Sequence, residues 1–356
     1  MIENRIAAFR RLLEKQGLDS FIVLNPANRF YLSGFKGTAG VLLITLKECF
    51  LITDFRYIEQ AKQEASSYQV IKYELSINAT VNEIAQKLHI KKMGFEEDYI
   101  TYSQYNNLHN ELIQISLIAT NQVTEEIRMI KDNEEINNIR KAAAIADEAF
   151  THILNIIAPG KKETEIGLEL EYYMLSKGAS KTSFQTIVAS GVRSALPHGT
   201  ATEKIIEKGD FVTMDFGCIY NQYCSDMTRT IVVGTPSTKQ KEIYNIVLKA
   251  QDLALEALKA NCKTKDIDAL SRGYIHEKGY GDNFGHGLGH SLGLDVHEKP
   301  SLSPKDSNIL KNNMIVTVEP GIYIPGWGGV RIEDLVVVNE TGIENLTHSP
   351  KDLIIL

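Results

Sequence analysis

Met214–Arg229 reads MDFGCIYNQYCSDMTR, and this stretch decides the fold of the second part of the chain. An apolar run ends at Gly217, a short turn follows, and a second apolar run continues to Val233. Two such runs around a short turn predict a β-hairpin. We place the centre of the turn between Tyr220 and Asn221.

This register puts two aspartates on one face of the hairpin. Asp215 falls directly opposite Asp226, and opposed residues of an antiparallel pair have Cβ atoms about 5 Å apart. Strands disfavour aspartate, and like charges repel strongly where water is excluded. A cation between the two carboxylates would remove both difficulties. The hairpin alone leaves an alternative open, in which one aspartate belongs to the turn and the other is a surface charge, because acidic side chains are mostly exposed.

Length and composition restrict the class of protein. The chain has 356 residues, 43% of them apolar, and a net charge of −7. This length favours two domains, and an acidic chain without a long basic run is not expected to bind nucleic acid. The charged start over residues 1–11 does not resemble a signal peptide, and no apolar stretch reaches the roughly 18 residues of a membrane span. We therefore expect a cytoplasmic protein without a membrane partner.

The four cysteines form no CxxC pair, so we predict neither a zinc ribbon nor a disulfide framework. Over residues 1–122, short apolar runs alternate with helical patterns, which predicts an α/β domain. The polar, charged stretch 123–134 predicts a linker. Residues 135–356 contain long helical patterns and strand-like runs, which predict an α+β domain with helices on one face of a mostly antiparallel sheet.

Histidines gather in one glycine-rich segment. Gly285–Glu298 reads GHGLGHSLGLDVHE and carries His286, His290 and His297, three of the nine histidines. Its glycines exclude a zinc-binding HExxH helix. A single histidine in such a loop is usually an ordinary polar residue, but three of them beside paired aspartates favour ligand or acid–base roles. His198 follows another predicted strand, in the turn SALPHG.

Two further acidic positions lie in apolar runs. MIVTVEP ends on Glu319, where a glutamate can equally well mark the rim of a sheet. VRIEDLVVV, residues 330–338, predicts one strand whose period of two places Arg331 and Glu333 on one face and Asp334 on the other. One of the two acids must therefore face the core, and the sequence leaves open which.

Together these motifs resemble the pita-bread metallopeptidases, the family of prolidase (Xaa-Pro dipeptidase), aminopeptidase P, methionine aminopeptidase and creatinase. The five-ligand pattern of that family is Asp, Asp, His, Glu, Glu. It falls in order on Asp215, Asp226, His290, Glu319 and Glu333, within DFG, SDMTRT, GHGLGHSLGLDVHE, VEPGIY and VRIEDLV.

The resemblance extends to the first part of the chain. NPANRFYLSGF and ITDFRY are similar to the α/β domain that prolidase and aminopeptidase P carry ahead of the catalytic domain, and that methionine aminopeptidase lacks. The resemblance implies a creatinase-type N-terminal α/β domain over residues 1–122 and a pita-bread catalytic domain of α+β class over residues 135–356.

The ligand chemistry predicts metal ions. Four carboxylates and one neutral imidazole would repel one another strongly unless two divalent ions balanced them. Oxygen-rich ligands with one imidazole suit Mn²⁺, Co²⁺ or Fe²⁺, and Zn²⁺ less distinctively. Two such ions can activate water and polarise a carbonyl group. The resemblance implies that Asp226 and Glu333 bridge the ions, that Asp215 holds one, and that His290 and Glu319 hold the other. Our first expectation is two Mn²⁺ ions per subunit.

The resemblance also implies catalytic roles around these ligands. Glu319 is expected to accept a proton from the attacking water. His198 and His297 match the histidines that face the substrate, one of which steadies the scissile carbonyl or the tetrahedral oxyanion. His286 and Arg331 match residues that contact the ligands or the substrate.

The resemblance implies hydrolysis of small peptides with proline at the second position. The short gap between Glu319 and Glu333 and the short tail after Leu335 favour a Xaa-Pro dipeptidase. The alternative is an aminopeptidase P, which releases the first residue from longer Xaa-Pro peptides. A third possibility is a catalytically silent peptide-binding relative, but such proteins usually lose ligands and none is lost here. A homodimer is the usual state of the family.

Overall fold

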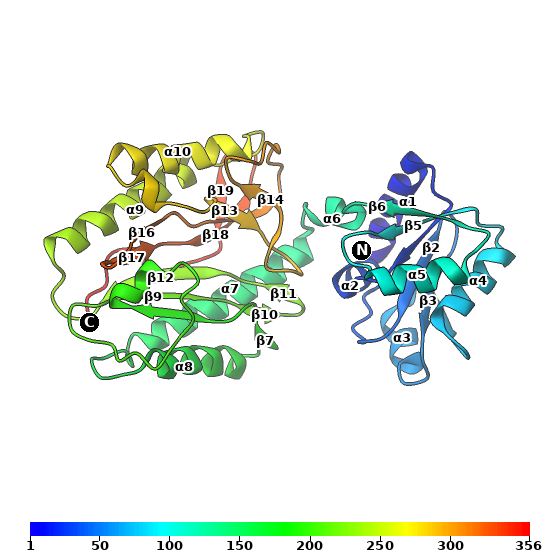
Figure 1. Ribbon diagram of the computed structural model, residues 1–356, viewed down its shortest axis with the longest axis horizontal. Coiled ribbons are helices and arrows are strands. Elements are labelled where there is room, and N and C mark those ends of the chain that lie inside the picture. The colour runs from blue at the N-terminus through cyan, green and yellow to red at the C-terminus, as the bar shows by residue number, and fades with distance from the viewer. The chain divides into compact units, whose positions relative to one another are not determined.

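The computed structural model describes all 356 residues, which divide into two compact units, Met1–Arg128 and Met129–Leu356 (Figure 1). No helix is long and apolar enough to cross a membrane. The start of the stretch 123–134 is helical: it forms α6 (Val123–Arg128), which packs on α1 (Ile2–Gln16) and α2 (Pro26–Ser33) within the first unit.

The first unit is an α/β layer structure, as its alternating pattern predicts. Its helices are α1 (Ile2–Gln16), α2 (Pro26–Ser33), α3 (Ile58–Glu64), α4 (Ile77–Lys87), α5 (Tyr102–Glu111) and α6. Its strands are β1 (Ser20–Val23), β2 (Val41–Thr45), β3 (Cys49–Thr53), β4 (Gln69–Lys72), β5 (Lys92–Glu96) and β6 (Ser116–Thr120).

The six strands form one mixed sheet in the order β4-β3-β2-β1-β5-β6. The central strands β1 and β2 are buried along their whole length, which explains their unbroken apolar runs. Helix α2 begins after Asn25, whose side chain accepts hydrogen bonds from the backbone N–H groups of Ala27 and Asn28. Pro26 at the first helical position completes a favourable helix start.

The second unit contains the longer helices and several small sheets. Its helices are α7 (Asn133–Ile153), α8 (Glu163–Ser176), α9 (Thr238–Ala257) and α10 (Thr264–Glu277), with 3₁₀ turns η1 (Gly191–Ala195) and η2 (Gly281–Asn283). The strands of its first half are β7 (Lys181–Thr182), β8 (Ile187–Ser190), β9 (Phe211–Phe216), β10 (Cys218–Tyr220), β11 (Tyr223–Cys224) and β12 (Met227–Val232). Those of its second half are β13 (Gly289–Ser291), β14 (Glu298–Leu302), β15 (Ile315–Val318), β16 (Gly321–Ile324), β17 (Gly328–Arg331), β18 (Asp334–Val338) and β19 (Ile343–Asn345).

Each half of this unit has its own helix pair and apolar core. In the first half, α7 and α8 pack against strands β8, β9 and β12 through residues such as Phe150, Leu170 and Met214. In the second half, α9 and α10 pack against the sheet β14-β13-β15-β18-β19, with Val247 and Val316 in the core. Figure 1 shows the two helix pairs on opposite sides of the strands in this view. Strand β12 contacts β17 and β18, so the two halves meet along it.

The hairpin is present, but its predicted register is wrong. Asn221 and Gln222 adopt positive φ angles of 47° and 76° and form the turn, so its centre lies one residue later than predicted. Asp215 therefore pairs with Thr228, and Asp226 lies just before β12 rather than opposite Asp215. The pairing is displaced by two residues, an even number, and strand side chains alternate with a period of two. Both aspartates consequently remain on one face.

The run VRIEDLVVV is two strands rather than one. It breaks after Arg331 into β17, which pairs with β16, and β18, which pairs with β15. The backbone N–H of Glu333, in the break, donates a hydrogen bond to the carbonyl of Thr228 in β12. The break settles which acid is structural, because Asp334 is buried in an ion pair with Arg229 at 2.7 Å. Glu333 faces a cavity instead.

Candidate active site

One cavity of about 850 Å³ in the second unit is lined by all nine residues that the sequence singled out. They are His198, Asp215, Asp226, His286, His290, His297, Glu319, Arg331 and Glu333. Three of them lie in strands β9, β13 and β17, and the other six lie in segments outside the strands, in both halves of the unit. The fold therefore gathers side chains that are more than 100 residues apart in the chain.

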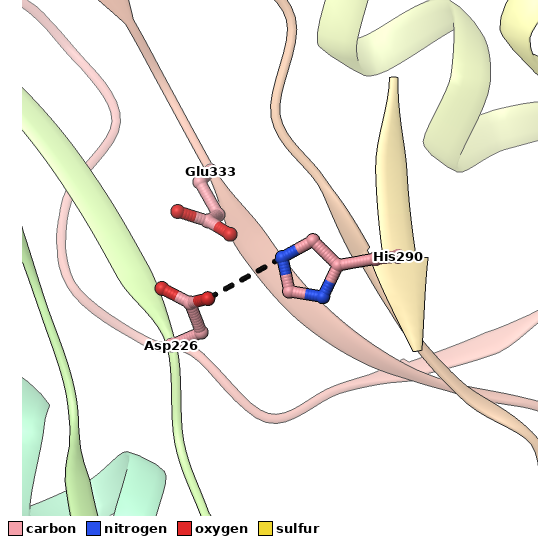
Figure 2. A group of neighbouring side chains, drawn as sticks. All are labelled: Asp226, His290 and Glu333. Atoms are coloured by element: carbon pink, nitrogen blue, oxygen red, sulfur yellow. Dashed lines mark ion pairs between the residues drawn. The ribbon is translucent and has the colours of Figure 1, made fainter. Parts of the chain in front are cut away.

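Three of these side chains converge closely. The ligand atoms of Asp226, His290 and Glu333 all lie within 4.8 Å of one another, and Figure 2 shows the three groups pointing toward a common centre. The Nε2 atom of His290 lies 3.5 Å from Asp226 Oδ2 and 3.4 Å from Glu319 Oε1. His290 Nδ1 lies 3.1 Å from the carbonyl oxygen of Ser291. That contact places the proton on Nδ1 and leaves the Nε2 lone pair facing the acids.

The carboxylates carry buried oxygens without partners. Oδ1 of Asp215, Oδ1 of Asp226 and Oε1 of Glu333 are buried and have no hydrogen-bond partner. The pKa values of Asp226 and Glu333 are raised well above the usual range. Burial is the largest cause, and repulsion by neighbouring carboxylates is the second. Burial likewise raises the pKa of Glu319 to about 8. Ionised carboxylates are acceptors only, so a cation is the partner that this set of atoms lacks, and the residues fit a divalent metal centre.

Arg331 holds one side of the acid cluster. Its Nη2 atom donates to Asp215 Oδ2 at 2.6 Å. Nη1 donates to the carbonyl of Pro197 and to the hydroxyl of Tyr323, and Nε donates to the hydroxyl of Thr228. Every nitrogen of this guanidinium is thus bonded within the protein. The hydrogen bond from Arg331 Nη2 fixes the orientation of the Asp215 carboxylate.

Tyr323 was not singled out by the sequence, because an aromatic residue in an apolar strand reads as core. Its hydroxyl also lies 2.9 Å from His286 Nε2. His286 Nδ1 lies 2.8 Å from the carbonyl of Gly287, so Nδ1 carries the proton and Tyr323 donates to Nε2. Burial lowers the pKa of His286 to about 4, which keeps this ring neutral near pH 7. A directed hydrogen-bond chain thus runs from Arg331 through Tyr323 to His286.

Glu163, also missed by the sequence, fastens the loop that carries His198. Its fully buried carboxylate accepts hydrogen bonds from the backbone and hydroxyl of Ser190, at 2.7 and 2.8 Å, and from those of Thr202, at 3.1 and 2.8 Å. Arg193 forms an ion pair with it. These contacts join the two ends of the loop around His198. A glutamate in the first turn of a helix ordinarily faces solvent. The position of Glu163 in the sequence therefore gives no sign of this role.

Comparison with known proteins identifies relatives over the whole chain. The model for metallopeptidase family M24 matches residues 137–340, and the model for the creatinase/prolidase N-terminal domain matches residues 5–130. A Xaa-Pro dipeptidase of Pyrococcus furiosus is 40% identical over 354 residues, which cover 99% of this chain and 100% of that protein.

Solved structures show the same similarity. A Xaa-Pro dipeptidase from Bacillus anthracis has a TM-score of 0.99 and 49% identity, with 100% of both chains covered. An X-Pro aminopeptidase from Thermotoga maritima MSB8 has a TM-score of 0.91 and 40% identity, with 96% of this chain and 99% of that chain covered.

Proposed function

This chain belongs to metallopeptidase family M24, and from that membership we propose that it hydrolyses the peptide bond before proline, acting chiefly as a Xaa-Pro dipeptidase. The fold class predicted from the sequence, a creatinase-type α/β domain followed by a pita-bread catalytic domain, is confirmed. One observation carries the proposal: acidic side chains from distant strands converge around His290, and three of their buried oxygens have no partner.

The second candidate is an aminopeptidase that acts on longer Xaa-Pro peptides. It is favoured by the Thermotoga maritima relative, whose structure is described as an X-Pro aminopeptidase and whose identity to this chain is as high as that of the Pyrococcus enzyme. In both cases the substrate is a small peptide with proline at its second position.

Two divalent ions, most suitably Mn²⁺, are proposed to bind the acid cluster. Asp226 and Glu333 would lie between the ions, Asp215 would hold one, and His290 and Glu319 the other. The support is the convergence of these side chains and the unpartnered oxygens of the aspartates and Glu333. When bound, such ions lower the pKa of water and polarise the scissile carbonyl.

The chain's own residues would then move protons and bind the substrate. Glu319 is proposed to accept a proton from the attacking water as oxygen bonds to the carbonyl carbon, and to pass it to the proline nitrogen as the peptide bond breaks. Its Oε1 atom already accepts a hydrogen bond from Thr317 at 3.2 Å. His198 and His297, on the cavity wall, are proposed to donate hydrogen bonds to the substrate oxygen that becomes negatively charged.

Assembly and location complete the proposal. We assign the catalytic domain to residues 135–356 and propose a cytoplasmic homodimer. The family resemblance supports the dimer.

The decisive experiment is an assay of the purified chain after loading with Mn²⁺, with Co²⁺, Fe²⁺ and Zn²⁺ in parallel. Release of free proline from Gly-Pro and Ala-Pro is expected, with reversible loss of activity on chelation by EDTA. A protein with both ions bound, as measured by elemental analysis, that cleaves no Xaa-Pro peptide would refute the proposal.

A further inference from the structure

One glutamine side chain contacts the backbone directly ahead of two acidic residues of the site. Gln251 lies in α9 and is fully buried. Its Nε2 atom donates hydrogen bonds to the carbonyl oxygen of Val318, at 3.0 Å, and to that of Ile332, at 3.2 Å. The first carbonyl belongs to the peptide bond that enters Glu319, and the second to the one that enters Glu333. A single amide group therefore joins the two segments that carry these glutamates.

Both of these peptide bonds are also held at their other end. The N–H of Glu319 donates to the carbonyl oxygen of Leu288 at 2.7 Å, and the N–H of Glu333 donates to that of Thr228 at 3.1 Å. A peptide group is planar, so hydrogen bonds at its carbonyl and at its N–H fix the orientation of the plane. The rotamers open to a side chain depend on the backbone around it. Gln251 therefore restricts the directions in which both glutamate side chains can point.

The two glutamates need such contacts because they lie outside the regular strands. Glu319 lies between β15 and β16, and Glu333 lies in the break between β17 and β18. Asp215, in contrast, is paired with Thr228 inside a strand ladder. Strand pairing thus fixes the backbone of the aspartate, whereas the glutamates depend on hydrogen bonds from other elements.

The surroundings of Gln251 indicate that its amide serves these contacts and not packing. Val247 and Ala254, one helical turn away on either side, are fully buried in the core that α9 forms with the sheet. A buried amide is unfavourable unless it is hydrogen-bonded, and its Oε1 atom is buried without a partner. The reversed amide would direct this oxygen at two carbonyl oxygens, which are acceptors only. A methionine would fill the same space without a polar atom to satisfy.

We propose that Gln251 is a positioning residue of the metal centre, which holds Glu319 and Glu333 at the separation that two ions require. The inference rests on the proposed function, because the metal centre is itself proposed there. Replacement of a residue that orients metal ligands typically lowers metal affinity 10–100-fold. The two affinities should fall unequally, because the ion assigned to His290 contacts both glutamates and the ion assigned to Asp215 contacts one.

The test measures Mn²⁺ binding to the full-length, metal-free protein by titration calorimetry, with the fold checked by circular dichroism. Gln251→Met keeps the length of the side chain and cannot donate. We expect it to bind at least one of the two ions about tenfold or more weakly than wild type. Gln251→Glu, whose buried carboxyl is neutral in such surroundings, offers one O–H where the amide offers two N–H groups. It should weaken binding about threefold or more, and it decides the test if the methionine variant does not fold.

Ser271→Ala is the matched control. The hydroxyl of Ser271 donates to the carbonyl oxygen of Ala250, the neighbour of Gln251 in α9, and this bond joins α10 to α9. The variant therefore loses a buried hydrogen bond at the same helix without a change next to either glutamate. We expect a lower melting temperature, with both Mn²⁺ affinities within about twofold of wild type.

Three results would overturn the inference and leave the peptidase intact. The first is wild-type affinity for both ions in the folded Gln251 variants, and the second is an equal loss of affinity in Ser271→Ala. The third is failure of both Gln251 variants to fold, because the residue would then support the fold and not the ligands. A wild-type protein that binds no Mn²⁺ would instead refute the proposed metal centre itself.

Discussion

Asp215 is bonded to Arg331 through one oxygen alone: Nη2 of the guanidinium lies 2.6 Å from Oδ2, whereas the buried Oδ1 has no hydrogen-bond partner. The charge-assisted hydrogen bond holds the carboxylate in one orientation, with the free oxygen available to a metal ion. The arginine also offsets part of the negative charge of the acid cluster, although it lies beside the cluster and not among its ligands.

Asp226→Asn should prevent normal metal binding. The side chain keeps its shape but loses the negative charge between His290 and Glu333. We expect elemental analysis of the dialysed variant to find fewer than two ions per chain, together with loss of peptidase activity. Asp295→Asn, which changes an exposed acid outside the cavity wall, is the matched control. Two ions bound with unchanged affinity would contradict the bridging assignment of Asp226.

His297→Ala should retain the metals and lose turnover. Its ring centroid lies 4.5 Å from that of His290, so it stands beside a proposed ligand without being one. Loss of a hydrogen-bond donor to the developing oxyanion lowers kcat by about 100-fold or more. His348→Ala, at an exposed position, controls for loss of an imidazole. Unchanged kinetics would remove His297 from the site.

Glu163→Gln should act through His198. The amide cannot accept all the hydrogen bonds that Ser190 and Thr202 donate to the carboxylate, so the loop loses its fixed position. We expect kcat/KM to fall about tenfold or more, with unchanged metal content. Glu165→Gln, in which glutamine can still cap the same helix turn, is the control.

A double-mutant cycle separates this positioning role from general stability. In a His198→Ala background, Glu163→Gln should change activity by no more than about twofold, because the group that Glu163 positions is already gone. An equal loss in both backgrounds would show that Glu163 supports the fold and not His198.

Tyr323→Phe should weaken catalysis without loss of metal. The change leaves Nε2 of His286 without a donor and removes one acceptor from Arg331. Removal of such supporting partners typically lowers activity 10–100-fold, and we expect the effect in kcat. Tyr172→Phe, on the exposed face of α8, is the control. Full activity in the variant would show that Asp215 and the other partners of Arg331 hold it in place without the tyrosine hydroxyl.

Glu96 in the first unit predicts a pH dependence of stability. It is 4% exposed, and burial raises its pKa from 4.5 to about 7, although it accepts hydrogen bonds from the backbone of Leu24 and Asn25 and from Asn28. Between pH 4.5 and 7 the unfolded glutamate ionises while the folded one keeps its proton. Folding stability therefore falls as pH rises through this window.

At 1.36 kcal/mol per pKa unit, the loss corresponds to roughly 3 kcal/mol. Urea unfolding of the first unit is monitored by hydrogen exchange. Between about pH 5 and 7.5 the wild type should lose stability relative to Glu96→Gln. Glu97→Gln, at the exposed neighbouring position, should track the wild type. Parallel pH profiles for wild type and Glu96→Gln would contradict the raised pKa.

Residue type and spacing predicted the helix pairs, and together with the family resemblance they predicted nine of the side chains that line the cavity. Acids inside apolar runs stand out in a sequence because burial of a charge needs a partner. The hairpin register was missed because it depends on φ angles at Asn221 and Gln222 that composition does not reveal. The break before Glu333 was missed because the apolar pattern of residues 330–338 continues through it. The two parts of this run nevertheless pair in two different sheets.

The supporting residues could not be predicted for a different reason. Glu163 and Tyr323 are recognisable only through partners that lie far away in the chain, such as Thr202 and His286. Neither has a local pattern that sets it apart from a helix-start acid or a core aromatic residue. The roles assigned to the cavity residues remain predictions, which the variants above test.

The acid cluster and the proposed substrate-facing histidines are carried by different kinds of structural element. Asp215 lies in a strand, and Asp226, Glu319 and Glu333 lie at strand ends, whereas His198 and His297 lie in surface loops. Loops accept substitution and insertion more readily than the elements that they connect. Directed evolution of these two loops should therefore be able to change which peptides are cleaved while the inherited metal chemistry is left untouched.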